Sequence, residues 1–189
     1  MKLAATGEGR IGAAALVGLA LCASCAARPP AHWQGGGTEV DIPRARWLRG
    51  DLVVDVVPEG RVLVGGMHVL SLDRAGRVFD LDADPVALLE VDGSVTGPDD
   101  EPLGKVGWGT AARAGEQMAW LVLNDSGEVL RIDEDGAAHS FGIWSGCGEP
   151  RSRVVCTLLT HLFASGRIDL PAPPPEPVGM GFGAAVVVP

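Results

Sequence analysis

The residues of this chain best suited to chemistry are its four cysteines, which occur as two widely separated pairs. Cys22 and Cys25 have the C-x-x-C spacing that redox centres and half of many zinc sites use. This pair follows directly after residues 11–21, "IGAAALVGLAL", the most apolar run in the sequence. Its position raises the question of whether the pair belongs to the folded domain at all.

Residues 1–24 have the organisation of an export signal. Lys2 and Arg10 precede the apolar run, and small residues follow it. A basic segment, a short apolar segment and a small-residue region together characterise a secretory signal peptide. A core helix or a membrane span is the alternative, but residues 11–27 are short for a span and rich in Ala and Gly, which partition weakly into lipid.

Residues 21–25, "LCASC", resemble the lipobox of bacterial lipoproteins, in which small residues precede a cysteine that becomes the lipidated first residue. The resemblance implies lipidation of Cys25 and a protein attached to the membrane through an N-terminal lipid anchor. Because Ala26 rather than Asp follows the cysteine, it also implies sorting to the outer membrane of the cell envelope. Several acyl chains give stable anchoring where a single chain does not.

The sequence departs from this family at Cys22, where leucine is usual. Ordinary cleavage after Ala26 or Ala27 therefore stays open as an alternative, and it would release a secreted or periplasmic protein. In either case the C-x-x-C spacing does not indicate a redox or zinc centre, because Cys22 leaves with the signal.

The chain is acidic, with a formal net charge of −9, and loss of residues 1–24 removes two basic residues and one acidic residue. This charge argues against a nucleic-acid partner, which requires a clustered basic surface. It also means that an anionic membrane repels the domain, so a covalent anchor would carry the attachment. Residues 25–39, which contain two prolines and a Gly triplet, are predicted to be a tether with nothing periodic to bury.

The body of the chain contains an internal repeat. Residues 67–84, "MHVLSLDRAGRVFDLDAD", align without gaps on residues 118–135, "MAWLVLNDSGEVLRIDED". In both copies alternating apolar residues lead into a four-residue turn that starts with Asp or Asn and ends with Gly, and a second alternating run follows. This pattern predicts a β-hairpin in each copy.

Further strand candidates flank both hairpins, so residues 40–170 are predicted to form a mainly β domain of antiparallel meanders. Four strands in about fifty residues are typical of a propeller blade, but closing a propeller takes about four blades and two fit here. A small sandwich, a barrel or a propeller-like arrangement therefore remain the candidate architectures. The acidic, turn-rich residues 92–105 are predicted to be an exposed joint between the copies.

The second cysteine pair, Cys147 and Cys156, brackets the loop "GEPRSRVV". In an exported protein two cysteines this close predict a disulfide, and their spacing fits neither a redox C-x-x-C nor a zinc finger. Residues 152–165 are predicted to form a helix with one apolar face, ended by Gly166 and attached to the sheet by the disulfide. Its β-branched residues leave a strand as the alternative. Residues 171–189 comprise a Pro-rich spacer and a tail, which either adds a final strand or stays a loose end.

Evidence for a catalytic or metal site is weak in this sequence. The four histidines, His32, His68, His139 and His161, are scattered and form no metal-binding pair, and no nucleotide-binding or nucleophile motif occurs. Alternating aspartates in residues 80–84 start like a calcium loop, but the required Gly and the final Glu are missing, so solvated turn residues are favoured. We therefore expect no metal and no cofactor.

The sequence predicts an envelope lipoprotein whose small β-rich domain has a binding or structural role, with another envelope protein as a candidate partner. The alternative is a periplasmic or secreted enzyme of the hydrolase kind, with a site assembled from distant residues, because a catalytic triad need not be local in sequence. These alternatives differ in one structural feature: an enzyme requires a histidine within reach of both an acid and a nucleophile.

Overall fold

Alternating apolar residues and tight turns give twelve strands in the computed structural model, which describes residues 27–168. The strands are β1 (Ala45–Arg49), β2 (Leu52–Val56), β3 (Arg61–Val64), β4 (Met67–Leu72), β5 (Arg77–Phe79), β6 (Pro85–Leu89), β7 (Ser94–Thr96), β8 (Pro102–Val106), β9 (Thr110–Arg113), β10 (Ala119–Leu123), β11 (Glu128–Ile132) and β12 (Ala138–Ser145). A 3-10 turn, η1 (Pro98–Asp100), lies between β7 and β8, and the helix α1 (Pro150–Ala164) follows β12.

The sheet is a meander closed on itself. Each strand pairs antiparallel with its neighbours in sequence, and β1 pairs with β12 to complete a barrel. Closure removes the free strand edges that would otherwise be open to pairing with other chains. The predicted mainly β meander with one short helix is confirmed, and among the candidate architectures the described residues form the barrel.

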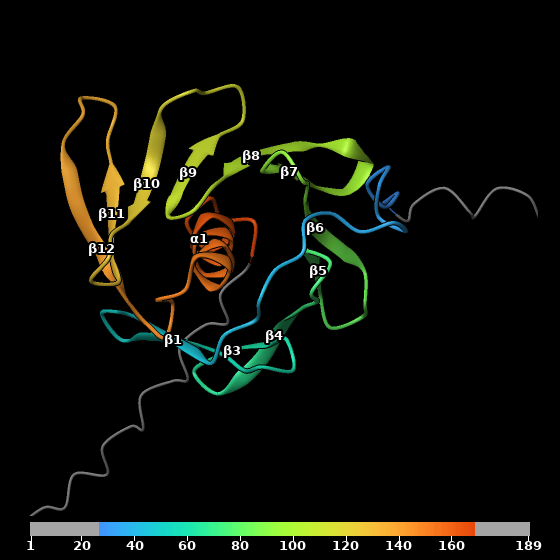
Figure 1. Cartoon of the computed structure of the whole chain (residues 1–189), viewed down its shortest axis with the longest axis horizontal. Coiled ribbons are helices and arrows are strands. Elements are labelled where there is room, and N and C mark those ends of the chain that lie inside the picture. The colour runs from blue at the N-terminus through green and yellow to red at the C-terminus, as the bar shows by residue number, and fades with distance from the viewer. Residues whose placement is uncertain (1–26, 169–189) are drawn as a thin grey trace, which may run out of the picture.

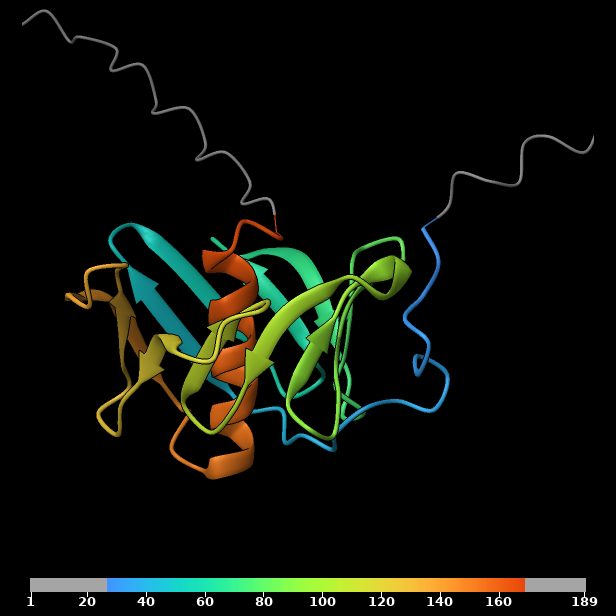
Figure 2. The ribbon, with the colours of Figure 1, turned by 90° about the horizontal axis from the view of Figure 1, so that it is seen from above.

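Helix α1 occupies the interior of this barrel. Figure 1 shows it end-on inside the ring of strands, and Figure 2 shows it from the side, running lengthwise through the barrel. Every residue from Val154 to Phe163 is buried. The prediction of a helix is confirmed, but the prediction of one apolar face is wrong, because strands surround the helix and all of its sides are covered.

The buried threonines of α1 are hydrogen-bonded inside the barrel. Thr157 and Thr160 donate to the helix carbonyls of Arg153 and Cys156, and Thr160 Oγ1 also accepts the indole N–H of Trp144 at 2.8 Å. These bonds allow β-branched, polar residues to lie in a central helix, since a buried polar group is tolerated when it has a partner. The helix begins at Pro150 and ends before Gly166, whose amide bonds back to Phe163.

The repeat in the structure is shorter than the 51-residue offset seen in the sequence. Five turns at one end of the barrel each contain a glycine whose carbonyl accepts the amide N–H of a residue in the next hairpin, at 2.7–2.9 Å. These glycines are Gly60, Gly76, Gly93, Gly109 and Gly127, separated by steps of 16, 17, 16 and 18 residues. The repeating unit is therefore one hairpin, and residues 67–84 and 118–135 are similar because they lie three units apart. We call this end of the barrel the glycine-turn end.

Residues 27–39 are packed against the barrel, so the prediction of a tether with nothing to bury is wrong for this segment. Trp33 is buried, with its ring edge-to-face against Phe79 at a centroid distance of 5.0 Å. The amide of Gly37 bonds to Ala75 and that of Thr38 to Leu89, both at 2.8 Å. A single tryptophan thus anchors a stretch whose Pro and Gly content suggested flexibility.

Residues 92–105 are also more ordered than predicted. They include β7, η1 and most of β8, three consecutive elements of the barrel wall. The sequence pattern did not reveal β7 because this strand is only three residues long, too short to show alternation. The acidic residues and glycines around it favoured a turn instead.

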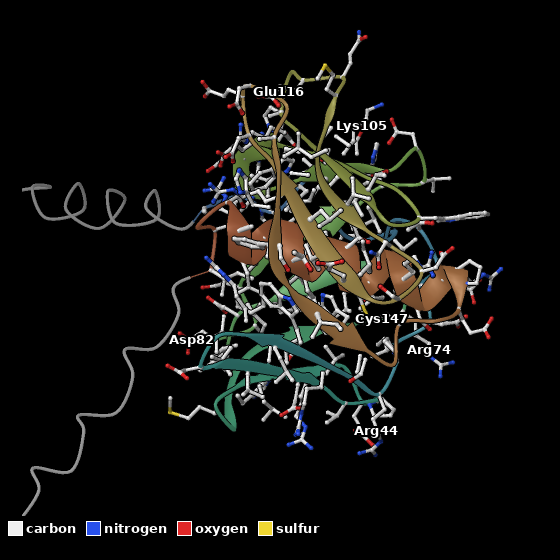
Figure 3. The ribbon with its side chains drawn as sticks, turned by 90° about the vertical axis from the view of Figure 1, so that its left-hand side faces the viewer. Arg44, Arg74, Asp82, Lys105, Glu116 and Cys147 are labelled. Carbon is white, nitrogen blue, oxygen red and sulfur yellow. A yellow bond between two sulfur atoms is a disulfide. The ribbon has the colours of Figure 1, made fainter. Side chains whose placement is uncertain are left out.

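The two ends of the described chain lie at the same end of the barrel, opposite the glycine-turn end. Arg28 pairs with Asp100 and Arg167 pairs with Glu101, so both contact the connection between β7 and β8. We call this the terminal end. Asp82 lies there too, whereas Arg44 and Arg74 lie at the glycine-turn end (Figure 3).

Candidate binding grooves

The predicted disulfide between Cys147 and Cys156 is present. It joins the loop after β12 to the second turn of α1, and both cysteines are buried. Figure 3 shows Cys147 beside the helix. The bond thus ties the barrel wall to the helix that fills its interior, which is a structural role.

Removing this disulfide is expected to lower the free energy of unfolding by about 2–3 kcal/mol, because a closed loop of this size restricts the unfolded chain. The measurement is denaturant unfolding of the Cys147→Ala/Cys156→Ala double variant beside the parent protein. A reducing agent should weaken the parent and leave the double variant unchanged. Equal stability of the two proteins would contradict the prediction.

Cys25, the predicted lipidation site, lies outside the described residues, as do the predicted signal in residues 1–24 and the predicted spacer and tail in residues 171–189. Among the described residues no helix has the length and hydrophobicity that crossing a membrane requires.

The histidines of the described chain each have a different environment, and none combines an acid with a nucleophile. His68 bonds to the hydroxyl of Ser71 at 3.1 Å, and His139 contacts Asp133 at 2.9 Å. His32 contacts Glu90 at 3.3 Å on the surface. The arrangement that the enzyme alternative requires is therefore not assembled around any histidine within residues 27–168.

His161 is part of the barrel's internal framework. Its Nε2–H donates to the carbonyl of Leu103 at 2.9 Å, and its Nδ1 accepts the indole N–H of Trp120 at 3.0 Å. Both ring nitrogens are therefore used by a neutral imidazole. Burial lowers the pKa of His161, opposed by its bond to Leu103 and reinforced by the nearby charge of Arg113.

His161 should make stability depend on pH. Because its pKa in the folded protein is below the ordinary value of 6.5, its contribution is complete above that pH and declines as the pH falls and the unfolded chain takes up the proton. The stability difference between the parent and His161→Leu, measured by denaturant unfolding, should be larger at about pH 7.5 than at about pH 5.5. A difference that stays constant with pH would contradict this.

The aspartates of residues 80–84 cap a turn. The carboxylate of Asp80 accepts the backbone N–H groups of Asp82 and Asp84 at 2.9 and 2.8 Å. This is the usual turn role of an aspartate that bonds to its own following backbone. In the part of the chain that the structure describes, no three His, Cys, Asp or Glu side chains are grouped so as to hold a metal ion.

With the interior filled, the concave features are grooves on the outer surface. One is a recess of about 790 Å³ over β7, β8 and β9, which we call the β7–β9 groove. Four residues that are cross-strand partners on adjacent strands span this groove: Ser94, Lys105, Ala112 and Ala119. Small side chains on both sides of Lys105 leave the recess open around a single lysine.

The charges of the β7–β9 groove are paired but accessible. Lys105 lies 3.8 Å from Asp92, and both side chains are about two-thirds exposed. Hydrogen bonds from the backbone and hydroxyl of Ser94, and then the charge of Lys105, lower the pKa of Asp92. Glu116, paired with Arg113 at 3.8 Å, lines the groove and lies on the same side of the barrel as Lys105 (Figure 3). The groove therefore presents both positively and negatively charged side chains.

A second groove follows the closure between β1 and β12. Two recesses of about 380 and 420 Å³ both include Leu48, Ser126 and Ile143, and we call their union the seam groove. Leu48 and Ile143 are directly opposed across the two strands and are 44% and 48% exposed. This groove is more apolar than the β7–β9 groove.

Sequence reasoning identified neither groove. Lys105, Leu48 and Ile143 have no local signature, because each groove combines residues from strands that are far apart in sequence. No protein-family model matches this chain, and comparisons with curated proteins and with solved structures find no match either.

Proposed function

We propose that this protein is a binding module of the bacterial cell envelope, held at the membrane by a lipid on Cys25, which recognises a partner on the outside of its barrel. The observation that carries the proposal is the burial of α1 on all sides. Ligand-binding barrels of similar construction need an open interior, and here the helix fills that space. Recognition must then use the outer surface.

The β7–β9 groove is the proposed recognition surface. Its volume lies within the range of about 300–1,000 Å³ that ligand sites occupy. Ser94, Thr96, Thr110 and Gln117 provide hydrogen-bonding groups along it, and Lys105 provides an accessible cation. These groups suit a polar, extended segment of another envelope protein better than an apolar small molecule.

Site-specific photo-crosslinking in the native envelope tests this proposal. A benzophenone residue at Ala112, on the floor of the groove, should give a discrete crosslinked product, and the same residue at the exposed Glu59 on the β2–β3 turn should not. The Lys105→Glu substitution should abolish the product by reversing the charge of this accessible cation. Equal products from both positions, or a product indifferent to Lys105→Glu, would overturn the proposal.

Lipidation would also orient the domain. Arg28 is held to the barrel by a backbone bond to Asp99 at 3.1 Å and an ion pair with Asp100 at 2.8 Å. Arg28 follows Cys25 by three positions, and an extended chain covers at most about 11 Å over that distance. A lipid on Cys25 would thus hold the terminal end beside the bilayer and direct the glycine-turn end away from it.

Metabolic labelling with palmitate tests the anchor. The parent protein should incorporate label and fractionate with membranes, whereas Cys25→Ser should do neither. Cys22→Ser is the matched control and should be labelled like the parent. An unlabelled, shorter parent protein would instead establish ordinary cleavage and a secreted or periplasmic product.

A further inference from the structure

The outer face of β1, β2 and β3 carries three arginines. Arg44 and Arg46 flank the buried Ala45 at the start of β1, so both side chains project away from the barrel interior. Arg61 precedes the buried Val62 in β3 and projects to the outer face for the same reason. Figure 3 shows Arg44 on the side of the strands that faces away from α1. Three cations therefore share one outer wall of the barrel.

This wall contains a recess of about 480 Å³, which we call the β1–β3 recess. The charged and half-buried apolar residues that line it are Arg44, Arg46, Asp55, Val57 and Leu63. Asp55 is the one carboxylate among the lining residues. Asp55 and Leu63 are cross-strand partners, and Arg61 lies two residues before Leu63 in β3, so it projects on the same face beside the recess.

Two of these three arginines have no compensating charge. Arg46 donates two bonds to the carboxylate of Asp55, from Nε at 2.6 Å and from Nη2 at 3.1 Å. Arg44 and Arg61 are exposed, and within residues 27–168 neither has an ion-pair partner. The nearest acidic residues along the chain, which are exposed and pair with neither arginine, are Asp41 and Glu59. A net positive surface therefore remains here in a chain whose net charge is −9.

The sheet fixes the separation between the two uncompensated arginines. Arg44 lies opposite Val57 in the continuation of the β1–β2 register, and the amide of Val57 bonds to the carbonyl of Arg61 at 3.1 Å. Two strand spacings, about 9–10 Å, thus separate the backbones of Arg44 and Arg61. Acidic residues about three positions apart in an extended chain span the same distance.

We propose that the β1–β3 recess binds an acidic segment of a partner polypeptide, with one carboxylate on Arg44 and a second on Arg61. A guanidinium donates two parallel hydrogen bonds to a carboxylate, and these are stronger than bonds between neutral groups. Val57 lies between the two arginines and offers apolar contact to the aliphatic part of the bound segment. An anionic membrane fits less well, because it meets the acidic domain as a whole, whereas a short segment contacts only the cationic recess.

The β1–β3 recess and the β7–β9 groove lie on opposite walls of the barrel. Figure 1 shows α1 between β1 and β3 on one side and β8 and β9 on the other. Neither site depends on the other, so failure of recognition in the β7–β9 groove would leave this proposal intact. Glu59, on the β2–β3 turn, is not one of the residues that line the recess.

NMR titration of the full chain with three probes tests the proposal. The probes are acetyl-Ala-Glu-Ala-Ala-Glu-Ala-amide, the same peptide with glutamine in place of glutamate, and inorganic phosphate. Backbone signals of Leu63 and Ser145, which both line the recess, report binding. The glutamate peptide should bind at least about tenfold more tightly than either other probe, since glutamine carries no charge and phosphate offers one anion in place of two.

A double variant assigns the site to the two arginines. Arg44→Gln/Arg61→Gln should abolish the preference for the glutamate peptide over the glutamine peptide. The matched control is Arg74→Gln/Arg151→Gln, which removes the same charge from two other exposed arginines that do not line the recess. This control should bind the glutamate peptide like the parent protein.

Asp55→Asn tests the same site through a gain of binding. Release of Arg46 from its carboxylate should tighten binding of the glutamate peptide by about two- to fivefold, which a damaged fold would not do. Equal binding of the glutamate and glutamine peptides by the parent protein would overturn the proposal, as would a preference that survives Arg44→Gln/Arg61→Gln. Phosphate that binds as tightly as the glutamate peptide would assign the arginines to phosphate groups and would overturn it too.

Discussion

Replacing Leu159 with alanine is expected to lower the free energy of unfolding by about 2–5 kcal/mol. Leu159 is completely buried in α1 and belongs to the single hydrophobic cluster that joins the helix to the barrel strands. Truncation removes apolar contacts and leaves a cavity, because strands on every side restrict collapse. A loss of this size is a large part of the total stability of an ordinary domain.

Denaturant unfolding checks this result. The matched control is Arg151→Ala, an exposed position in the first turn of the same helix, where alanine should change stability by less than about 0.5 kcal/mol. If Leu159→Ala were as harmless as Arg151→Ala, the helix would not be the core of the barrel. Recognition on the outer surface would then lose its physical basis as well.

The second large effect is expected at Gly127. Its φ is +87°, and a Cβ built there overlaps the carbonyl oxygen of Trp144 on β12. Gly136 provides a matched control, with a φ of +83° and open space where its Cβ would lie. Gly136→Ala should be destabilising by about 1–2 kcal/mol, the usual strain of alanine in a left-handed conformation.

Gly127→Ala should be destabilising by a further ~1–3 kcal/mol, because the overlap forces the hairpin away from β12. It would also stretch the 2.7 Å bond between the carbonyl of Gly127 and the amide of Trp144. The two variants are compared by thermal or denaturant unfolding. Equal losses would mean that backbone strain alone explains these glycines and that the contact between hairpins contributes nothing.

The hairpin repeat is only partly visible in the sequence, because one part of its pattern is local and the other part is a contact between hairpins. The turn pattern of residues 67–84 and 118–135 is local, since Asp73 and Asn124 bond to their own turn backbone, so it predicted both hairpins. The shorter hairpin unit depends on a bond from each glycine carbonyl to the next hairpin. That bond makes no demand on residue type beyond the glycine, so the intervening units need not share a sequence pattern.

Local physical chemistry also accounts for the residues that sequence analysis placed correctly. The Cys147–Cys156 spacing limits the pairing choices, and the apolar spacing around Leu158 and Leu162 is a helix period. The mistakes have a common cause. Trp33 and the short strand β7 depend on partners that are distant in the chain, and neither a single tryptophan nor a three-residue strand carries a periodic signal.

The sequence by itself determined the elements of this protein: β-hairpins, one helix near the end of the domain, a disulfide and an acidic surface. Only the tertiary structure decided that the sheet closes, that the helix lies inside it, and that two grooves form outside. Hairpin turns, helix periods and a short cysteine loop are set by neighbours along the chain. Closure of β1 on β12 and the meeting of Arg49 with Phe141 depend on packing between residues about ninety positions apart, and no local pattern encodes that packing.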